Sequence, residues 1–562
     1  MDSIQSRKRF GMVIVATLGL SGLSLLGMGL GWFASPAVPE ASTRPAVAGP
    51  TANQPLGIVR PGAGVFTSDG PQVAEATAKG AACEGCDVVL ITVCSLRKDH
   101  LGTYGFSKDI SPSIDALADT AVRFNRAYAA SNFTLASLTS LLTGRYGSAT
   151  GVTGWDKGLT VDVPTLATVL SVYGYRTGAF TTDAPSGFRP DYGLDRGFQH
   201  MEITPPPRNT PDGRFRGGTK GELGAVALPA VSWLEKQPED HPMFLMMHTR
   251  TAHFPFVVDP PTEGEDPTGM RQLLFDAGQA ESKGRAGQAM PGMAGGTAQE
   301  GIVEIVRQDP LQTQVNALGK SAMDVWRETY AEGVTRMDAD VETLLKAVHK
   351  RGRPTVVVLV ADHGESLNDH GELLHGDAFF HGVINVPLII SVPGLKGALG
   401  ERNALVSQTD VLPTILDLVG AVAPAGVDGT SLVELLKGSD EEVHGLVLSE
   451  GGVAKQEGDA LPGAVIAPPW MLIKQRRGCG GSAPMSRGVS DQGMPVCLFN
   501  LEKDPGLNNS VSGSHPQEVQ DLLERWNGFR KAHGRLGERR ELSDAFIEEL
   551  QRSGYDFSTG AP

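Results

Sequence analysis

One short segment, ADHGESLNDHGELLHGD at residues 361–377, crowds histidines and carboxylates together directly after the apolar run TVVVLV. Imidazole and carboxylate groups are the usual protein ligands of divalent metals, which makes Asp362, His363 and His375 candidate site residues. Their spacing matches no compact zinc motif such as HEXXH. The segment therefore predicts metal-ligand chemistry without naming the ion.

A second apolar run, VVLITV, ends in Cys94 and Ser95, with Arg97 two positions later. A buried strand that ends in a polar cluster is where an α/β enzyme usually places its chemistry. Here the cluster opens with a thiol and a hydroxyl instead of a carboxylate. Cys94 and Arg97 are therefore candidates for metal or substrate binding.

Two further stretches carry polar groups that could join this site. MFLMMHTRTAHFPF contains His248 and His253, and SNFTLASLTSLLTG places Thr134 at the expected start of a helix. Simpler interpretations exist, because a hydroxyl at a helix start is most often an N-cap, and His253 could be a packed loop histidine. The carboxyl ends of parallel strands share one edge of a sheet, so we expect the four stretches to converge.

The elements that would position these residues alternate between strands and helices from Asp87 onward. VVLITV, MFLMMHTR and TVVVLVA are predicted strands. LASLTSLLTG is a predicted helix that ends at Gly144, and SPSIDALADTAVRFNRAYA has apolar residues at helical spacing. This order predicts a three-layer α/β/α sandwich with a mostly parallel central sheet.

The predicted domain organisation has four parts. They are an N-terminal anchor or signal peptide (1–34), a flexible Pro/Ala/Gly-rich linker (35–86), a catalytic domain (87–440) with an inserted surface loop (257–320), and a small C-terminal α+β subdomain with a closing helix (441–562).

The N-terminal segment predicts export. RKRF precedes an uncharged stretch at residues 11–33, which is long enough for a membrane-spanning helix and resembles a long signal peptide as well. Because the basic residues come first, the body of the protein is expected on the periplasmic or extracellular side, either anchored or secreted.

Composition excludes one class of partner and suggests a redox compartment. The 562 residues carry a net charge of −15 without a basic stripe, which argues against nucleic-acid binding. The cysteines fall into two pairs that could form disulfides, Cys83 with Cys86 and Cys479 with Cys497. Cys94 is left over.

The motifs in their order closely resemble the sulfatase family of the alkaline phosphatase superfamily, over roughly residues 87–505. The resemblance is carried by DHLGTYG, TLASLTSLLTGRYG, TLATVLSVYGYRTGAF, GLDRGF, HTRTAHFPF, VADHGE, VPLIISVPG and DVLPTILDLVGAVAPAGVDGTSL. It implies an alkaline phosphatase-like fold and hydrolysis of a sulfate or phosphate ester with a divalent metal, which could be Zn²⁺, Mn²⁺, Mg²⁺ or Ca²⁺.

The resemblance also implies roles for individual residues. Thr134 matches the nucleophile, Asp362 and His363 match the downstream metal ligands, and His253 matches the histidine that contacts the ester or its leaving oxygen. His375 falls near a substrate-binding position. Arg97 and His248 complete the set of candidate substrate-binding residues.

Two departures from the family pattern are large. Sulfatases have a cysteine or serine that is converted to formylglycine, whereas this chain has Thr134, with Ala136 and Leu138 in place of the proline and arginine that recruit the modifying machinery. No formylglycine is therefore expected. The family's metal-binding aspartates are replaced by Cys94 and Ser95, so a Ca²⁺ site is disfavoured. Cys94 could bind a softer ion, the metal could be held weakly by the remaining ligands, or the site could be inactive.

Three functional hypotheses follow. The leading one is a sulfatase-like hydrolase or transferase with a threonine nucleophile, acting on an anionic ester of a glycan or lipid head group; the lost formylglycine motif slightly favours phosphate. The alternative is a catalytically degenerate sulfatase fold that serves as a binding or scaffold module in the cell envelope. A thiol oxidoreductase that uses the CEGC motif is the third.

Overall fold

The computed structural model describes residues 82–539, apart from 183–187, 189–191, 205–225, 257–260, 262–263, 265, 283–307, 396–398, 453–460, 477, 480–489, 492 and 536. The predicted N-terminal anchor, nearly all of the linker and the predicted closing helix at the C-terminus lie outside the described residues. Among the residues that are described, none of the helices combines the length and apolar character needed to cross a membrane.

The central sheet has eight strands in the order β11-β2-β10-β7-β1-β6-β4-β5. Their bounds are β1 (Asp87–Val93), β2 (Val122–Tyr128), β4 (Arg176–Thr182), β5 (His200–Thr204), β6 (Met243–Thr249), β7 (Thr355–Ala361), β10 (Leu388–Ser391) and β11 (Gly400–Ser407). Only β10 runs antiparallel to its neighbours, β2 and β7. The prediction of a mostly parallel sheet is confirmed.

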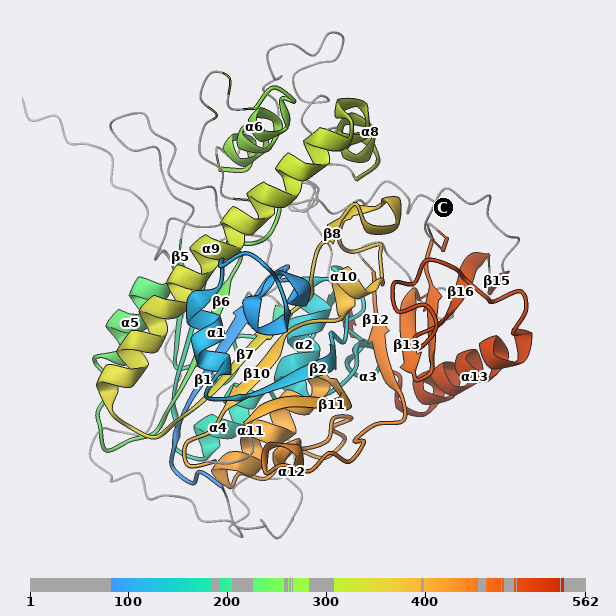
Figure 1. Ribbon diagram of the computed structural model, residues 1–562. Helices are drawn as coiled ribbons and strands as arrows, with labels where there is room; N and C mark the ends of the chain where they lie inside the picture. The colour runs from blue at the N-terminus through green and yellow to red at the C-terminus, as the bar shows by residue number, and fades with distance from the viewer. Residues whose placement is uncertain are drawn as a thin grey trace, which may run out of the picture. The chain divides into compact units, whose positions relative to one another are not determined.

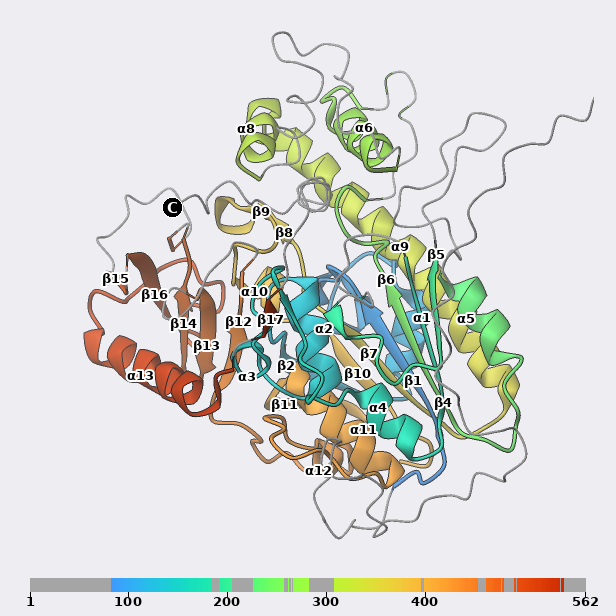
Figure 2. The same cartoon turned by 180° about the vertical axis from the view of Figure 1, so that it is seen from behind.

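Helices cover both faces of this sheet (Figures 1 and 2). One face is covered by α1 (Pro112–Ala118), α5 (Ala227–Leu234) and α9 (Lys320–Arg351), and the other by α2 (Thr134–Thr143), α4 (Leu166–Val172), α11 (Val411–Val419) and α12 (Val433–Leu436). Along β1, Val89 and Ile91 pack in the first core, and Val88 and Leu90 in the second. A central strand buried on both faces is typical of a parallel sheet, and the three-layer prediction is confirmed.

Short elements lie between the main ones. They are η1 (Lys98–His100), η2 (Gly102–Tyr104), α3 (Gly147–Thr150), β3 (Lys157–Gly158), β8 (Ser366–Leu367), η4 (Asp369–Gly371), β9 (Leu373–Leu374), α10 (His381–Ile384), η5 (Gln408–Asp410) and β17 (Glu538–Arg539). Several of them, including η1, β8, β9 and α10, belong to loops that follow the ends of β1 and β7, close to the candidate site residues.

The segment SPSIDALADTAVRFNRAYA, which has apolar residues at helical spacing, is not one helix. The helix α1 ends at Ala118, and the chain turns before entering β2 at Val122. In VRFNRAY, the buried Val122 and Phe124 alternate with partly exposed polar residues, which is the period of a strand. The sequence prediction therefore mistook β2 for a continuation of α1.

The predicted surface loop at 257–320 contains two helices, α6 (Met270–Ser282) and α8 (Gln308–Leu318), both of which contact α9. Met270 and Leu274 in α6, and Leu311 and Val315 in α8, are fully buried in the core. The two apolar residues of each pair are four positions apart, which is helical spacing. The many Gln and Gly residues of the segment hid this pattern and led to the prediction of a loop.

The C-terminal part forms a second, five-stranded antiparallel sheet in the order β12-β13-β14-β16-β15, with α13 (Pro516–His533) packed against it (Figure 1). Its strands are β12 (Val447–Glu450), β13 (Gly463–Ala467), β14 (Trp470–Lys474), β15 (Ser490–Asp491) and β16 (Met494–Asn500). Glu450 of β12 links α13 to α3. Its Oε1 accepts a hydrogen bond from Trp526 Nε1 in α13, and its Oε2 accepts from Ser148 N and Oγ in α3.

The expected cysteine pairing is confirmed. Cys83 is joined to Cys86, and Cys479 is joined to Cys497. Cys94 is free and buried.

The start of β1, the strand that leads to Cys94, is held by a buried ion pair whose loss should destabilise the fold. The Asp87 carboxylate is fully buried and accepts hydrogen bonds from Arg351 Nε at 2.7 Å, Arg353 Nε at 3.1 Å and Met243 N at 3.0 Å. Asp87→Ala would leave the largely buried Arg351 side chain without its carboxylate partner, with only backbone carbonyls as acceptors. We expect the free energy of unfolding to fall by about 3 kcal/mol.

Denaturant unfolding of the purified protein measures this change. The control is Lys350→Ala, which removes an exposed ion pair with Glu235 and should change the free energy of unfolding by less than about 1 kcal/mol. Equal, small effects in both variants would contradict the role of Asp87.

Candidate active site

Three side chains from three elements meet at one edge of the central sheet. Cys94 follows β1, Thr134 is the first residue of α2, and His363 follows β7. The Thr134 Oγ1 atom lies 3.2 Å from His363 Nε2 and 3.4 Å from Cys94 Sγ, and Cys94 Sγ lies 3.9 Å from His363 Nε2. All three side chains are fully buried. The sequence expectation that these stretches converge agrees with this geometry.

Cys94 is held at the end of its strand by a turn at the next residue. Ser95 has a φ of 61°, a left-handed conformation that costs free energy in any residue with a Cβ. Tyr330 donates its hydroxyl to Ser95 O at 2.8 Å, and Ser95 N donates to Asp362 Oδ1 at 3.3 Å. These two contacts fix the turn and tie the end of β1 to the end of β7.

Asp362 and His363 each contribute an acceptor atom to the site. Asp362 Oδ1 accepts from Ser95 N and from His363 N, whereas Oδ2 is buried and has no hydrogen-bond partner in the described part of the chain. His363 Nδ1 donates to Gly364 O at 2.8 Å, which leaves the lone pair of Nε2 directed at Thr134 and Cys94. The Thr134 hydroxyl therefore donates to Nε2.

The donor set fits a divalent cation. Cys94, Asp362 and His363 each offer one ligand atom, and these atoms all lie within 4.8 Å of one another. An orphaned buried carboxylate oxygen and an imidazole lone pair aimed at a common point are the features of a metal site. The histidine's second nitrogen is held by a backbone carbonyl, which is the arrangement that orients metal-binding histidines.

Burial sets the protonation of these groups in the metal-free protein. Desolvation raises the pKa of the Cys94 thiol, and the neighbouring Asp362 charge raises it further. Desolvation also lowers the pKa of His363 to about 4, although Asp362 opposes this shift. At neutral pH the site therefore holds a thiol and a neutral imidazole.

Thr134 does not act as a helix cap. The N-cap of α2 is Phe133, in an extended conformation, and no side chain caps the helix. The Thr134 hydroxyl instead faces Cys94 and His363. The interpretation of this residue as an ordinary cap is wrong, whereas the predicted end of the helix at Gly144 is confirmed.

Arg250, which the sequence analysis did not single out, places a buried positive charge next to these residues. Its side chain is fully buried, and Nη2 donates to His253 Nε2 at 3.1 Å. His253 Nδ1 in turn donates to Phe254 O at 2.5 Å. The charge of Arg250 lowers the pKa of Cys94, opposing the larger effects of burial and of Asp362.

The signal that could have found Arg250 is its position. It lies in HTRTAHF, between two histidines that were already candidates, directly after a fully buried strand. A charged residue at such a strand end is rarely buried without a function.

His375 lies against the histidines of the site. Its ring centroid is 4.2 Å from that of His363 and 4.8 Å from that of His253, and Nδ1 lies 3.0 Å from Glu365 Oε1. Glu365 thereby orients His375. The structure thus groups His253, His375 and Arg250 around the Thr134 and Cys94 cluster.

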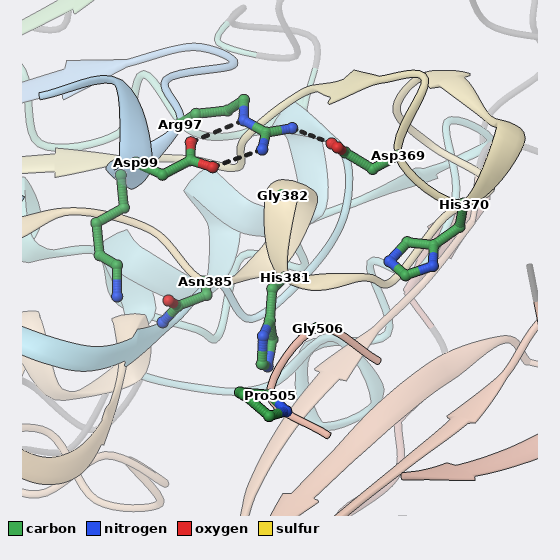
Figure 3. A pocket seen from close by; sticks show the side chains of 10 residues that line it. Arg97, Asp99, Asp369, His370, His381, Gly382, Asn385, Pro505 and Gly506 are labelled. Atoms are coloured by element: carbon green, nitrogen blue, oxygen red, sulfur yellow. Dashed lines mark hydrogen bonds and ion pairs between the residues drawn. The ribbon is translucent and has the colours of Figure 1, made fainter. Parts of the chain in front are cut away.

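Two sequence candidates are not among the three candidate ligands, although His248 interacts electrostatically with Asp362 and His363. His248 is buried beside Thr92, with Nδ1 2.9 Å from Thr92 Oγ1, and burial lowers its pKa to about 4. The Arg97 guanidinium is paired with Asp99 and Asp369 (Figure 3). Neither side chain joins the three ligand candidates.

Arg97 lines a neighbouring cavity of about 230 Å³, bounded on its other side by His381 and Pro505 (Figure 3). A Cβ at Gly382 would lie 2.6 Å from Arg97 Nη1, so a larger residue there would push the guanidinium from its present position. Arg97 also donates to Glu365 O at 2.9 Å, so it supports the loop that carries Glu365.

Comparison with known proteins agrees with the resemblance inferred from the motifs. The Sulfatase family model matches residues 87–421, more than half of the chain. A delta 4,5-hexuronate-2-O-sulfatase of Bacteroides thetaiotaomicron is 24% identical over 442 residues, which cover 74% of this chain and 83% of that protein. An arylsulfatase of Clostridium perfringens is 24% identical over 484 residues, covering 78% and 92%.

The fold is also similar to that of a solved structure. The phosphonate monoester hydrolase of Agrobacterium radiobacter aligns with a TM-score of 0.58 at 20% identity, covering 80% of this chain and 96% of the other. At this identity the likeness concerns the fold.

Proposed function

Because this chain belongs to the sulfatase family of sulfuric ester hydrolases, we propose that it cleaves an anionic sulfate or phosphate ester by attack of the Thr134 hydroxyl. The observation that carries this proposal is the position of Thr134 Oγ1. It lies 3.2 Å from His363 Nε2 and 3.4 Å from Cys94 Sγ, and it serves no capping role in α2. A nucleophile within hydrogen-bond reach of such groups is the arrangement that activates a hydroxyl.

Cys94, Asp362 and His363 are the residues that would hold a divalent cation. When bound, the cation polarises the nonbridging oxygens of the ester and lowers the pKa of the attacking hydroxyl. The Asp362 Oδ2 atom supports this role, because it has no hydrogen-bond partner among the described residues and such a buried carboxylate oxygen is costly unless it binds something.

The reaction then consists of two displacements. Thr134 Oγ1 forms a bond to the sulfur or phosphorus, the bond from that atom to the alcohol oxygen breaks, and the alcohol takes up a proton. Thr134 has a single hydroxyl, so water must attack the same sulfur or phosphorus to release the free anion. Water returns one proton to Thr134, which balances the proton that the hydroxyl lost.

Arg250 is the group that we assign to the developing negative charge. Both ring nitrogens of His253 are engaged, Nδ1 with Phe254 O and Nε2 with Arg250, so His253 positions the guanidinium in this arrangement. A preorganised, buried guanidinium stabilises an anionic transition state more strongly than an exposed one does.

Arg250→Met should lower kcat by about 10²–10³-fold, since a transition-state donor is removed. Arg250→Lys keeps the charge but loses the planar guanidinium group, so its kcat should lie between those of Arg250→Met and the wild type. Steady-state kinetics on an ester that the protein hydrolyses measures kcat for both variants. Arg126→Met, which removes a surface pairing with Glu442, is the control and should leave kcat unchanged. An Arg250→Met variant with wild-type kcat would remove Arg250 from the mechanism.

The relatives suggest a carbohydrate ester as the substrate, because one of them is a hexuronate-2-O-sulfatase. Because the fold is also similar to that of a phosphonate monoester hydrolase, phosphorus esters are included among the candidate substrates. The missing formylglycine motif favours phosphorus slightly. A lipid head group that carries such an ester is the second source of the same chemistry.

A matched panel of esters tests the proposal. Purified full-length protein is incubated with aryl and sugar sulfates, phosphates and phosphonates that share the same leaving groups, after loading with zinc, manganese, magnesium or calcium. Metal-dependent release of one leaving group is expected. If the protein binds one of the esters but hydrolyses none of them, the alternative of a binding module is supported. The replacement of two metal-binding aspartates by Cys94 and Ser95 is the observation that favours this alternative.

We also propose that the folded body works outside the cytoplasm. The disulfides Cys83–Cys86 and Cys479–Cys497 support this, because such bonds persist in oxidising compartments. The uncharged stretch at residues 11–33 would serve as anchor or signal peptide. Digestion of the protein by protease added to intact spheroplasts would agree with this location, whereas full protection would contradict it.

A further inference from the structure

We propose that Cys94 makes this centre a zinc site with a thiolate ligand, in which Thr134 Oγ1 occupies the fourth coordination position. The inference rests on the proposed function, since it names the ion that the candidate active site takes. It also goes further, because the sulfatase pattern has an aspartate where this chain has Cys94.

The spacing of the donor atoms agrees with a tetrahedral zinc site. Zinc bonds of about 2.3 Å to sulfur and 2.0–2.1 Å to nitrogen or oxygen place neighbouring ligand atoms roughly 3.3–3.6 Å apart in a tetrahedron. Here Thr134 Oγ1 lies 3.2 Å from His363 Nε2 and 3.4 Å from Cys94 Sγ. Asp362 Oδ2 and Cys94 Sγ lie 3.6 Å and 3.9 Å from His363 Nε2. These four separations are close to the tetrahedral values, and the three candidate ligand atoms all lie within 4.8 Å of one another.

The kinds of donor disfavour the hard cations calcium and magnesium. Calcium takes six to eight oxygen ligands, and magnesium requires a near-octahedral set of oxygens. Among the three candidate ligands only Asp362 supplies oxygen, because the others are a thiol and an imidazole. Sulfur and imidazole donors together select zinc over calcium and magnesium.

Each ligand is prepared for this role by its surroundings. Asp362 Oδ2 is buried without a hydrogen-bond partner in the described structure, and His363 Nε2 presents its lone pair because Nδ1 is bound to Gly364 O. Cys94 is the free cysteine among the five of the chain, so its sulfur is not consumed by a disulfide. On binding, its thiol proton is released and a sulfur–metal bond forms.

Three protein ligands with a fourth, open position are typical of catalytic zinc sites, whereas structural zinc is enclosed by four protein ligands of the Cys and His type. Cys94, Asp362 and His363 would be the three ligands, and the hydroxyl of Thr134, the reacting group, lies beside them on the side where the fourth position would be. If the ion binds, these three residues would hold it next to the Thr134 hydroxyl, where it would lower the pKa of that hydroxyl.

Cobalt substitution tests the sulfur ligand without any need for activity. Wild-type protein freed of metal and reloaded with Co²⁺ should show the intense near-ultraviolet absorption of a thiolate–cobalt bond, together with the visible bands of a tetrahedral ion. The Cys94→Ser variant should lose the near-ultraviolet band. The Thr134→Val variant should keep it, because the thiolate remains.

A second variant covers the case in which Cys94→Ser does not fold. Cys94→Asp restores an oxygen ligand, and its zinc Kd should rise by at least about 100-fold while manganese or magnesium gains affinity. Metal content and metal-dependent Tm measure this shift. Unchanged zinc affinity in Cys94→Asp, or a wild-type cobalt spectrum without the near-ultraviolet band, would overturn the inference.

The outcomes separate this inference from the proposed function. A thiolate–cobalt band in a protein that hydrolyses none of the esters would leave the zinc site standing and refute the enzyme. Hydrolysis that requires magnesium or calcium, with no such band, would refute the zinc site and leave the enzyme standing.

Discussion

Replacing Thr134 with valine should lower kcat for ester hydrolysis by about 10⁴-fold or more, because valine keeps the shape of threonine but has no oxygen to attack sulfur or phosphorus. Thr134→Ser retains a hydroxyl at the same helix position and should keep a substantial part of the activity. The helix should form in both variants, since Thr134 does not cap α2. Initial rates on the ester identified in the panel provide the measurement.

The matched control lies in the same helix. Thr139 is buried, and its hydroxyl donates to Leu135 O at 2.7 Å instead of facing the site. Thr139→Val should leave kcat unchanged. A Thr134→Val enzyme as active as wild type would mean that the nucleophile is another group or a water molecule. Equal losses in both variants would indicate damage to α2.

The Asp362→Asn variant should change stability in opposite directions with and without metal. In metal-free protein the substitution removes a buried charge whose Oδ2 has no hydrogen-bond partner in the described residues, while the amide oxygen can still accept from Ser95 N and His363 N. Removing the charge also removes the desolvation cost of this fully buried carboxylate. The free energy of unfolding of the metal-free protein should therefore stay equal or rise by about 1 kcal/mol.

With metal the sign reverses. At a free metal concentration about 100 times Kd, the wild-type protein gains about 2.7 kcal/mol of stability, and the variant loses most of this gain because a charged ligand is missing. Its kcat should fall by about 10³-fold, since several kcal/mol of charge stabilisation depend on the bound ion. Thermal unfolding with and without added zinc, together with initial rates, measures both effects.

Asp338→Asn is the control for this experiment. Asp338 is a buried carboxylate remote from the site that accepts from Ser113 N and Ile114 N at the start of α1. Its substitution should leave the metal-dependent gain in stability unchanged. An Asp362→Asn protein that gains as much stability from zinc as wild type would show that Asp362 is not a ligand.

Much of the fold could be predicted from the sequence because burial on two faces leaves a plain pattern. DVVLITV and TVVVLVA are continuous apolar runs, and such runs are typical of central parallel strands. Once these strands are placed side by side, Cys94 and Asp362 must lie at the same edge of the sheet. The convergence of the site residues follows from this topology.

The parts that were misjudged have weaker patterns. The strand β2, VRFNRAY, follows α1 after a turn of only a few residues. Its apolar residues therefore extended the helical spacing of the α1 sequence. In α6 and α8, few apolar residues are needed because each helix buries only one narrow stripe against α9. Local composition resembles that of a loop in such helices.

Side-chain partners in the site could not be predicted from the sequence. Arg97 was a candidate for substrate binding, but its charge is paired with the nearby Asp99 and with Asp369, which is distant along the chain. The pairing with Asp369 depends on the fold, and spacing along the chain does not contain that information. Arg250 lies inside the quoted motif HTRTAHFPF, but its contact with His253 and its full burial became evident only in the structure.

The most direct test of the central claim is to find the covalent intermediate. Full-length protein is mixed with the hydrolysed ester, quenched in acid during turnover and digested, and the peptides are mapped by mass spectrometry. The mechanism predicts a sulfate or phosphate group on Thr134 that is absent from the Thr134→Val protein. Turnover with no labelled residue, or with the label on another side chain such as Cys94, would contradict the claim that Thr134 is the nucleophile.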